Sequence, residues 1–257
     1  MIGAIAGDII GSIYEAVPIK TKDFPLFGAG VTFTDDTVCT VAIADALLSG
    51  GDCARHLRAH VRRYPGRGYG GMFARWAHDP DMPAYGSWGN GAAMRVSAVA
   101  HLAAEEAEAL ATAARTAEVS HDHPDAIAGA QATVLAAWLA RRGLAPDAIR
   151  TEIESRFGYD LGQSVAHIRA SYAFEISCKG TVPPAIACAL EADGYEDAIR
   201  NAISLGGDSD TLACITGGIA EALHGLPAEI AEQARGYLDA DLLRVVERFY
   251  RTIGQAA

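Results

Sequence analysis

The helical spacing of the apolar residues limits the fold of this 257-residue chain more than any other feature. In segment after segment an apolar residue returns every three or four positions, whereas the alternating pattern of half-buried strands is nearly absent. Glycine or proline separates most of these segments from the next. The segments are 36–49, 52–64, 91–103, 105–119, 124–142, 146–156, 183–192, 195–204, 210–223 and 227–252. This spacing predicts an all-α fold of about ten or more helices.

Length and composition favour one domain. Half of the residues are apolar, which is enough for a substantial buried core. Neither a low-complexity linker nor a block of like charges marks a domain boundary, and no repeat has a solenoid period. We therefore expect a compact single domain over residues 1–257, built as an orthogonal helix bundle.

The charge balance excludes some classes of partner. Lys and Arg total 21 against 32 Asp and Glu, which gives a formal net charge of -11. This charge opposes general affinity for nucleic acid or for an anionic membrane. A ligand with phosphate groups would need local devices, such as metal ions, glycine-rich backbone or helix N-termini.

The cysteines and the first residues of the sequence indicate the cellular compartment in which we expect the protein. The five cysteines are scattered and form no Cys-x-x-Cys pair, which favours a reducing cytoplasm. The first residues lack the basic region of a secretory signal, and the longest apolar run, 126–140, is interrupted by Gly129 and Gln131. We expect a cytoplasmic protein without a membrane span.

Two acidic clusters stand at predicted helix starts. Residues 34–37 read Thr-Asp-Asp-Thr, and residues 208–211 read Asp-Ser-Asp-Thr after two glycines. Helix capping alone explains either cluster. Both, however, offer hard oxygen ligands without nearby Cys or His, which favours Mg²⁺ or Mn²⁺ over Zn²⁺. If the clusters converge, their four carboxylates could bridge two cations roughly 3.5–4 Å apart.

The N-terminal segment and two loops add candidates. Small residues at positions 3, 7 and 11 allow another helix to approach closely, but they do not explain Asp8 and Glu15. Composition alone favours surface positions for these two carboxylates. The glycine-rich stretches 64–71 and 83–91 do not have helical spacing, and such loops on a helical scaffold commonly form binding sites.

Other side chains receive ordinary structural interpretations. His56 and His60 have a metal-compatible spacing of four, yet they lack nearby partners in the sequence and lie among arginines, which favours a solvated basic face. His121 and His123 form an incomplete zinc set. Three aromatic residues are assigned to core packing: Trp76, Trp138 and, in preference to a place in a ligand cleft, Phe174.

Six motifs in order resemble those of the ADP-ribosylglycohydrolase family. That family includes the dinitrogenase reductase-activating glycohydrolase and the eukaryotic ADP-ribosylserine and ADP-ribosylarginine hydrolases. The motifs are Gly7-Asp8-x-x-Gly-Ser-x-Tyr-Glu15, Phe33-Thr-Asp-Asp-Thr37, Arg67-Gly-Tyr-Gly70, Ser87-Trp-Gly-Asn-Gly-Ala-Ala-Met-Arg95, Ser120-His121 and Ser204-Leu-Gly-Gly-Asp-Ser-Asp-Thr211. Their common order is far more specific than any one of them.

The resemblance implies an all-α fold with a binuclear Mg²⁺ or Mn²⁺ centre at helix N-termini. The implied metal ligands are Thr34, Asp35, Asp36, Asp208, Asp210 and Thr211. The implied catalytic residues are Glu15, Asp35 and Asp208, with Glu15 a ligand, a gate or an acid/base. The implied substrate-binding residues are Gly68, Tyr69, Gly70, Ser87, Trp88, Gly89, Asn90 and His121. Tyr172, Phe174 and Lys179 resemble a loop of the family that walls the ligand cleft.

The resemblance also implies the reaction. We expect hydrolysis of the C1″ glycosidic bond of a mono-ADP-ribosylated acceptor, with ADP-ribose as the product. The expected partner is an ADP-ribosylated protein or another ADP-ribosylated acceptor, and an acidic cleft favours arginine over serine or a nucleobase. Two alternatives stay open: a non-catalytic homologue that binds ADP-ribose or is structural like a lens crystallin, and a two-metal nucleotide phosphoesterase.

Overall fold

Two helices in close contact form the centre of the fold, α1 (Ile2–Ala16) and α13 (Ser209–His224). The computed structural model describes residues 1–254. A Cβ atom on Gly7 would lie 2.0 Å from the carbonyl oxygen of Ala213, and one on Gly11 would lie 2.6 Å from the Cα atom of Asp210. The small residues of α1 therefore bring its backbone directly against α13, as their spacing predicts.

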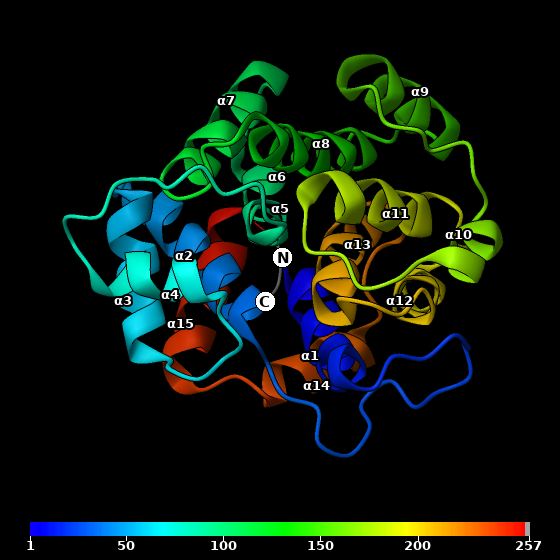
Figure 1. Ribbon diagram of the computed structural model, residues 1–257, viewed down its shortest axis with the longest axis horizontal. Helices are drawn as coiled ribbons and strands as arrows, with labels where there is room; N and C mark the ends of the chain where they lie inside the picture. Colours follow the sequence, from blue (N-terminus) through cyan, green and yellow to red (C-terminus); the bar gives the residue numbers. More distant parts are fainter. Residues whose placement is uncertain (255–257) are drawn as a thin grey trace.

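The other helices surround this pair (Figure 1). They are α2 (Asp35–Ser49), α3 (Cys53–Arg63), α4 (Gly71–His78), α5 (Gly91–Met94), α6 (Val99–Leu102), α7 (Glu106–Glu118), α8 (Pro124–Arg141), α9 (Pro146–Phe157), α10 (Val165–Ser171), α11 (Cys178–Leu190), α12 (Tyr195–Ser204), α14 (Ala228–Gly236) and α15 (Ala240–Thr252). Within residues 1–254 there is no strand, only an isolated bridge between Gly89 and Ser177. The predicted all-α class is confirmed.

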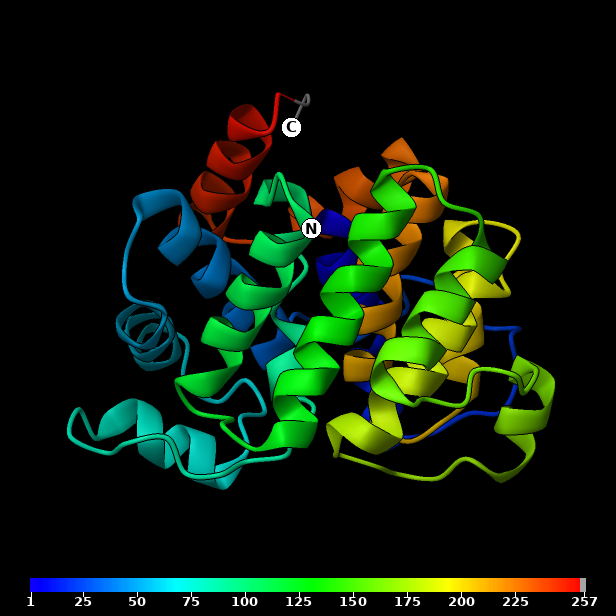
Figure 2. The same ribbon diagram turned by 90° about the horizontal axis from the view of Figure 1, so that it is seen from above.

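The helices gather on two sides of the central pair. Figure 1 shows α2, α3, α4 and α15 on the left and α10, α11 and α12 on the right, and Figure 2 shows α7 and α8 side by side. One continuous hydrophobic core joins both sides and contains Trp76 and Trp138, as predicted. The chain forms a single domain. None of the helices in residues 1–254 has both the length and the apolar character that crossing a membrane requires.

Some helix boundaries differ from the prediction. The segment 227–252 is two helices, because Asp239 interrupts it and caps α15 by accepting hydrogen bonds from the backbone N–H groups of Asp241 and Leu242. The segment 91–103 is likewise divided into α5 and α6. The short helices α4 and α10 lie in segments for which the spacing predicted none.

Helix α11 begins five residues before the predicted start at position 183. Ser177 caps it by accepting a hydrogen bond from the N–H of Gly180, and the helix continues through Pro183 and Pro184. A proline inside a helix leaves the carbonyl four residues before it without a partner. For Pro184 that carbonyl belongs to Gly180, and it accepts a 3.2 Å hydrogen bond from the hydroxyl of Tyr172.

Candidate active site

The two acidic clusters meet where the N-terminal ends of α2 and α13 lie against α1. Thr34 caps α2, and Asp208 stands directly before α13. The Thr211 hydroxyl donates a 3.2 Å hydrogen bond to Oδ2 of Asp36 and so joins the two clusters. The structure thus brings together side chains that are 175 positions apart in the sequence.

Two groups of three carboxylates form at this junction. Asp8, Asp36 and Asp210 each offer an oxygen, and the three oxygens lie within 4.8 Å of one another. Glu15, Asp208 and Asp210 form the second group by the same measure, so Asp210 is common to both.

The donor set at this junction fits a hard cation. Oδ1 of Asp36 is buried and accepts no hydrogen bond, and a buried oxygen without a partner is costly unless a cation or proton satisfies it. All the donors are oxygens, which is the set that Mg²⁺ and Mn²⁺ prefer. Asp35, which the resemblance also implies as a ligand, lines the cavity beside these groups.

Asp8 is buried, so the expectation that it is a surface charge is wrong. Its carboxylate accepts hydrogen bonds from the N–H and hydroxyl of Thr34, at 3.0 and 2.5 Å, and from the N–H and hydroxyl of Thr37. These bonds tie α1 to the first turn of α2. Only its place within the glycine stripe of α1 could have indicated that Asp8 faces another helix.

Burial and mutual repulsion disfavour the charged forms of these carboxylates. Burial, followed by the charges of neighbouring aspartates, holds the pKa values of Asp36 and Asp210 well above their usual range. Burial and the charge of Asp8 raise the pKa of Asp35 to about 8. Burial and the charge of Asp208 also raise the pKa of Glu15. Bound cations would relieve this repulsion.

A cavity of about 490 Å³ opens above the carboxylates, a size typical of small-molecule sites. Most of the implied substrate-binding residues line it: Gly68, Gly70, Ser87, Trp88, Gly89, Asn90 and His121. Tyr69 does not line it, since its hydroxyl donates to the carbonyl of Tyr64 and its ring packs near Phe73. Thr34 also lies outside the lining, because its hydroxyl is bonded to Asp8.

The loop from Arg67 to Gly70 is held against the start of α2. The N–H of Asp35 donates a 2.8 Å hydrogen bond to the carbonyl of Arg67. Gly68 has a φ of 97°, which favours glycine, and a Cβ there would lie 3.2 Å from Oδ1 of Asp35. The loop therefore presents backbone to the cavity beside an implied metal ligand.

The second glycine loop is joined to both α11 and α13. The Asn90 side-chain amide donates to Oδ2 of Asp208 at 2.7 Å and to Oγ1 of Thr181 at 3.2 Å. The backbone N–H of Asn90 donates to the carbonyl of Ile176, and the N–H of Gly89 donates to Oγ of Ser87. Asn90 thus positions a carboxylate of the cluster as well as lining the cavity.

Arg95 is a cavity residue to which the motifs assigned no role. Its guanidinium is fully buried and donates to the carbonyl of Thr116 and to Oγ of Ser120, while Nε and Nη1 have no partner. The same Ser120 hydroxyl lies 2.8 Å from Nδ1 of His121. Burial and the charge of Arg95 lower the pKa of His121, so its ring is neutral at the cavity wall.

Exposed apolar side chains form the rim of the cavity. Phe174 is 60% exposed and Trp88 is 47% exposed, and both line the cavity with Met72 and Ile176. The prediction that Phe174 packs in the core is wrong, since the loop before α11 turns its ring outward. Lys179 lies with Tyr172 in a neighbouring cavity, and Phe174 lines both cavities. The rim offers apolar surface above an acidic floor.

Known proteins share the sequence pattern and the fold. The family model of ADP-ribosylglycohydrolase matches residues 1–257. ADP-ribosylhydrolase ARH3 of Homo sapiens is 26% identical over 324 residues, which cover 94% of this chain and 89% of that protein. The Xenopus tropicalis protein of the same name is 26% identical, with 94% and 91% covered, and that of Mus musculus is 25% identical, with 94% and 88% covered.

A solved structure of an ADP-ribosylglycohydrolase-related protein complex superimposes with a TM-score of 0.71 at 22% identity, covering 98% of this chain and 97% of that chain. That likeness shows the fold, and the family model covers the whole sequence. The chain belongs to the ADP-ribosylglycohydrolase family and is a hydrolase of glycosidic bonds.

Proposed function

We propose that this protein is a magnesium-dependent hydrolase that releases ADP-ribose from a mono-ADP-ribosylated protein side chain. The observation that carries the proposal is the pair of carboxylate groups sharing Asp210 at the floor of a cavity of about 490 Å³. The rim and the buried Arg95 suit a ligand with an aromatic base and two phosphates. With its five cysteines all free, we propose a cytoplasmic location.

The acidic floor would hold two Mg²⁺ ions, or Mn²⁺ in their place. Five of the proposed ligands line the cavity: Asp35, Asp36, Asp208, Asp210 and Thr211. The sixth is Thr34, which stands at the start of α2 with its hydroxyl donated to Asp8. Glu15 is close enough to join them. When bound, the cations supply Lewis-acid polarisation of the distal ribose hydroxyls and of a water molecule.

The side chains supply the remaining chemistry. The oxygen of water forms a bond to C1″ while the bond from C1″ to the acceptor breaks, and the bonding electrons leave with the acceptor atom. Glu15, whose pKa is raised by burial and by Asp208, gives its proton to the departing acceptor. Asp35, whose charged form bound cations would restore, takes the proton of the water, and Asp208 stabilises the positive charge that builds on the ribose ring.

The cavity walls would orient the diphosphate and the base. Gly68 and Gly70 present backbone beside Asp35, and the unpaired Nη1 of Arg95 supplies positive charge. The exposed indole of Trp88 offers a stacking surface at the rim. On the acceptor side, the acidic floor of the cavity suits a guanidinium, so we propose arginine as the first acceptor to test.

A product assay tests the proposal. Purified protein is incubated with peptides ADP-ribosylated on arginine or on serine, and with ADP-ribosylated DNA, each in Mg²⁺, in Mn²⁺ and in EDTA. Mass spectrometry should find intact ADP-ribose from at least the arginine peptide, only when metal is present.

Other products would overturn the proposal. AMP or inorganic phosphate in place of ADP-ribose would identify a phosphoesterase. Metal-dependent ADP-ribose binding in calorimetry, without any release from the three substrates, would identify a binding protein. The Asp36→Asn variant is the matched control for metal dependence, because it keeps the size of the side chain whose Oδ1 is unpaired.

A further inference from the structure

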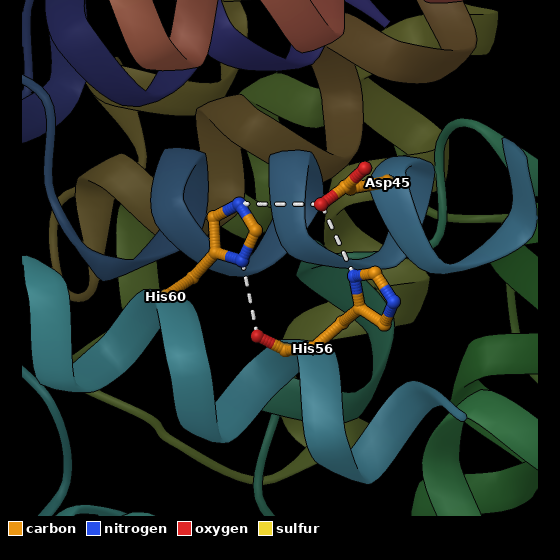
Figure 3. A group of neighbouring side chains, drawn as sticks. All are labelled: Asp45, His56 and His60. Atoms are coloured by element: carbon orange, nitrogen blue, oxygen red, sulfur yellow. Dashed lines mark hydrogen bonds and ion pairs between the residues drawn. The ribbon is translucent and has the colours of Figure 1, made fainter. Parts of the chain in front are cut away.

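A second polar cluster lies between α2 and α3, outside the cavity described above. Asp45 projects from α2, and His56 and His60 project from α3 toward it (Figure 3). One ligand atom from each residue lies within 4.8 Å of the other two. The expectation that the histidines lack partners on a solvated basic face is therefore wrong, since the preceding helix supplies a carboxylate.

The carboxylate oxygen Oδ2 of Asp45 is shared by both imidazoles. It lies 3.1 Å from Nδ1 of His56 and 4.0 Å from Nε2 of His60. The three side chains are only 14–23% exposed, so water competes little for these atoms while one side of the cluster stays open. Gly51 leaves room for the His56 ring, because a Cβ there would lie 2.7 Å from its Nε2 atom.

The tautomer of His60 is fixed by its backbone contact. Nδ1 of His60 lies 3.0 Å from the carbonyl oxygen of His56, which can only accept, so Nδ1 carries the proton. Nε2 of the neutral ring then presents a lone pair toward a negatively charged oxygen of Asp45. At 4.0 Å, these two electron-rich atoms are placed so that one cation could accept a lone pair from each of them. A metal-ligating histidine commonly donates its other ring N–H to a carbonyl in this way.

A proton is the weaker choice of cation. Burial is the largest influence on His60 and lowers its pKa, and the charges of His56 and Arg63 act in the same direction against the opposing effects of Asp45 and the His56 carbonyl. The other facing charges are cationic as well: Arg248 of α15 lies 3.6 Å from Oδ1 of Asp45, and Arg55 lies 3.4 Å from Nε2 of His56. His60 is therefore a neutral ligand near pH 7.

We propose that Asp45, His56 and His60 form a binding site for a transition-metal ion of the Zn²⁺ class, separate from the acidic magnesium site. Two imidazoles and one carboxylate favour Zn²⁺, Co²⁺ or Ni²⁺ over Mg²⁺. Ligand atoms around tetrahedral zinc lie roughly 3.3 Å apart for bonds near 2 Å. The 3.1 Å pair is close to this spacing, and a small rotation of the His60 side chain closes the 4.0 Å pair.

Binding moves protons in a defined way. The ion replaces the proton that Nδ1 of His56 now directs at Asp45, and the neutral ring then carries its proton on Nε2. The exposed guanidinium of Arg55, the present neighbour of Nε2, turns toward solvent. Water from the open side completes four-coordination. Metal affinity falls at acid pH, because an imidazole must be unprotonated at the ligating nitrogen to bind a metal.

Such an ion would connect two parts of the cleft. Helix α2 begins at Asp35 in the acidic cluster, and α3 leads into the loop whose Arg67 carbonyl accepts the N–H of Asp35. A metal bridge from Asp45 to His56 and His60 would hold these two helices together. We therefore assign this ion a structural role. Its removal should leave the residues of the hydrolytic site in place.

Cobalt spectroscopy tests the site. Untagged, chelator-stripped protein is kept in excess Mg²⁺, so that the acidic site is filled, and is titrated with Co²⁺ and then with Zn²⁺. One equivalent of Co²⁺ should give the strong visible absorption of four-coordinate cobalt, and Zn²⁺ should abolish it. His60→Gln and Asp45→Asn should each weaken Co²⁺ binding at least about 10-fold, since changing even an outer-shell partner of a metal ligand typically costs about that much.

His78→Gln is the matched control. His78 on α4 makes the same contact to the carbonyl four residues before it, at 2.8 Å from Ala74, but belongs to no such trio in residues 1–254. Its Co²⁺ spectrum should equal that of the wild type. Zn²⁺ should raise the Tm of the wild type and of His78→Gln but leave the Tm of His60→Gln unchanged. The unfolding transition in each of these melts also shows that the variant is folded.

Two results would overturn the proposal. One is the same Co²⁺ absorption and affinity in His60→Gln as in the wild type. The other is an NMR titration in which His60 takes up its proton above pH 7 and does not respond to Zn²⁺, which would identify an ion pair with Asp45. Neither readout depends on hydrolysis, so both stand apart from the test of the proposed function.

Discussion

The side-chain amide of Asn90 donates a 2.7 Å hydrogen bond from Nδ2 to Oδ2 of Asp208. This bond joins the second glycine loop, which lines the cavity, to the residue that precedes α13. Its second N–H contact, to Thr181, fixes the amide from the side of α11. The acidic floor and the cavity wall are therefore one connected unit, in which Asn90 orients a carboxylate of the acidic floor.

Asn90→Ala should weaken metal binding without unfolding the protein. Residues that hold metal ligands typically contribute 10- to 100-fold in metal affinity or activity. We expect a loss of that size in the Mn²⁺ affinity measured by calorimetry. Asn201→Ala is the control, since Asn201 is also buried but donates to the carbonyl of Cys188 outside the cleft. Equal Mn²⁺ affinities in the two variants would contradict the role of Asn90.

The metal-free protein should lose stability as pH rises from 6.5 to 8.5. The pKa of Asp35 in the fold is about 8 against 3.8 as its ordinary value, and those of Asp36 and Asp210 are also raised. Between the two values the folded state binds more protons than the unfolded state, so each such group lowers stability by up to about 1.4 kcal/mol per pH unit.

The histidines do not oppose this trend over most of the window. His60, His101 and His121 have lowered pKa values, so their opposite effect on stability ends near their ordinary value of 6.5. Burial raises the pKa values of the five cysteines, which lowers stability in the same direction as the carboxylates near the top of the window. Thermal denaturation in EDTA should show the Tm falling from pH 6.5 to 8.5, and saturating Mg²⁺ should reduce the fall. A metal-free Tm that is constant or rises over this range would show that the carboxylates are already compensated.

The sequence predicts the fold class and the paired clusters because both depend on local patterns. Apolar spacing identifies most helices, and Thr34 and Asp208 stand where helix starts are expected. The helices α4 and α10 are short, with 8 and 7 residues, so few apolar positions repeat within them. Their positions depend on packing against the rest of the chain.

The missed site residues depend on contacts between distant segments. Thr34 and Thr37 donate hydrogen bonds to the buried carboxylate of Asp8, and nothing in its own segment beyond the glycine stripe indicates these partners. Asp45 meets His56 and His60 only because α2 and α3 pack together. Arg95 lies within one of the motifs, but the motif does not show that its guanidinium is buried with no carboxylate partner.

Gly7→Ala should be strongly destabilising, by at least about 3 kcal/mol in the free energy of unfolding. The added Cβ would lie 2.0 Å from the backbone oxygen of Ala213, so α1 and α13 would have to separate. Gly236→Ala is the control, because that helical glycine has no atom within 4 Å of an added Cβ. Urea denaturation should place Gly236→Ala within about 1 kcal/mol of the wild type. A Gly7→Ala variant of similar stability would show that the two helices separate easily.

Glu15→Gln should lower kcat by about 10²- to 10⁴-fold, the usual contribution of a positioned general acid. Glu15 is exposed at the cavity wall; burial of part of its carboxyl and the charge of Asp208 raise its pKa, which favours the protonated form that a general acid needs. Glutamine has the same size and cannot deliver that proton. If Glu15 acts as the acid, a substrate with a good leaving group should recover most of the lost rate, since its departure needs little protonation.

The same variant separates the acid from a metal ligand or a gate. For an acid, Mn²⁺ affinity and the affinity for ADP-ribose should stay within a few-fold of the wild type, and the alkaline limb of the pH–rate profile should disappear. A ligand would instead show a large loss of Mn²⁺ affinity, and a gate would change substrate affinity and kcat together. Glu175→Gln is the control, since Glu175 accepts hydrogen bonds from the N–H groups of Ile176 and Ser177, which glutamine can also accept. Its pH–rate profile should match that of the wild type.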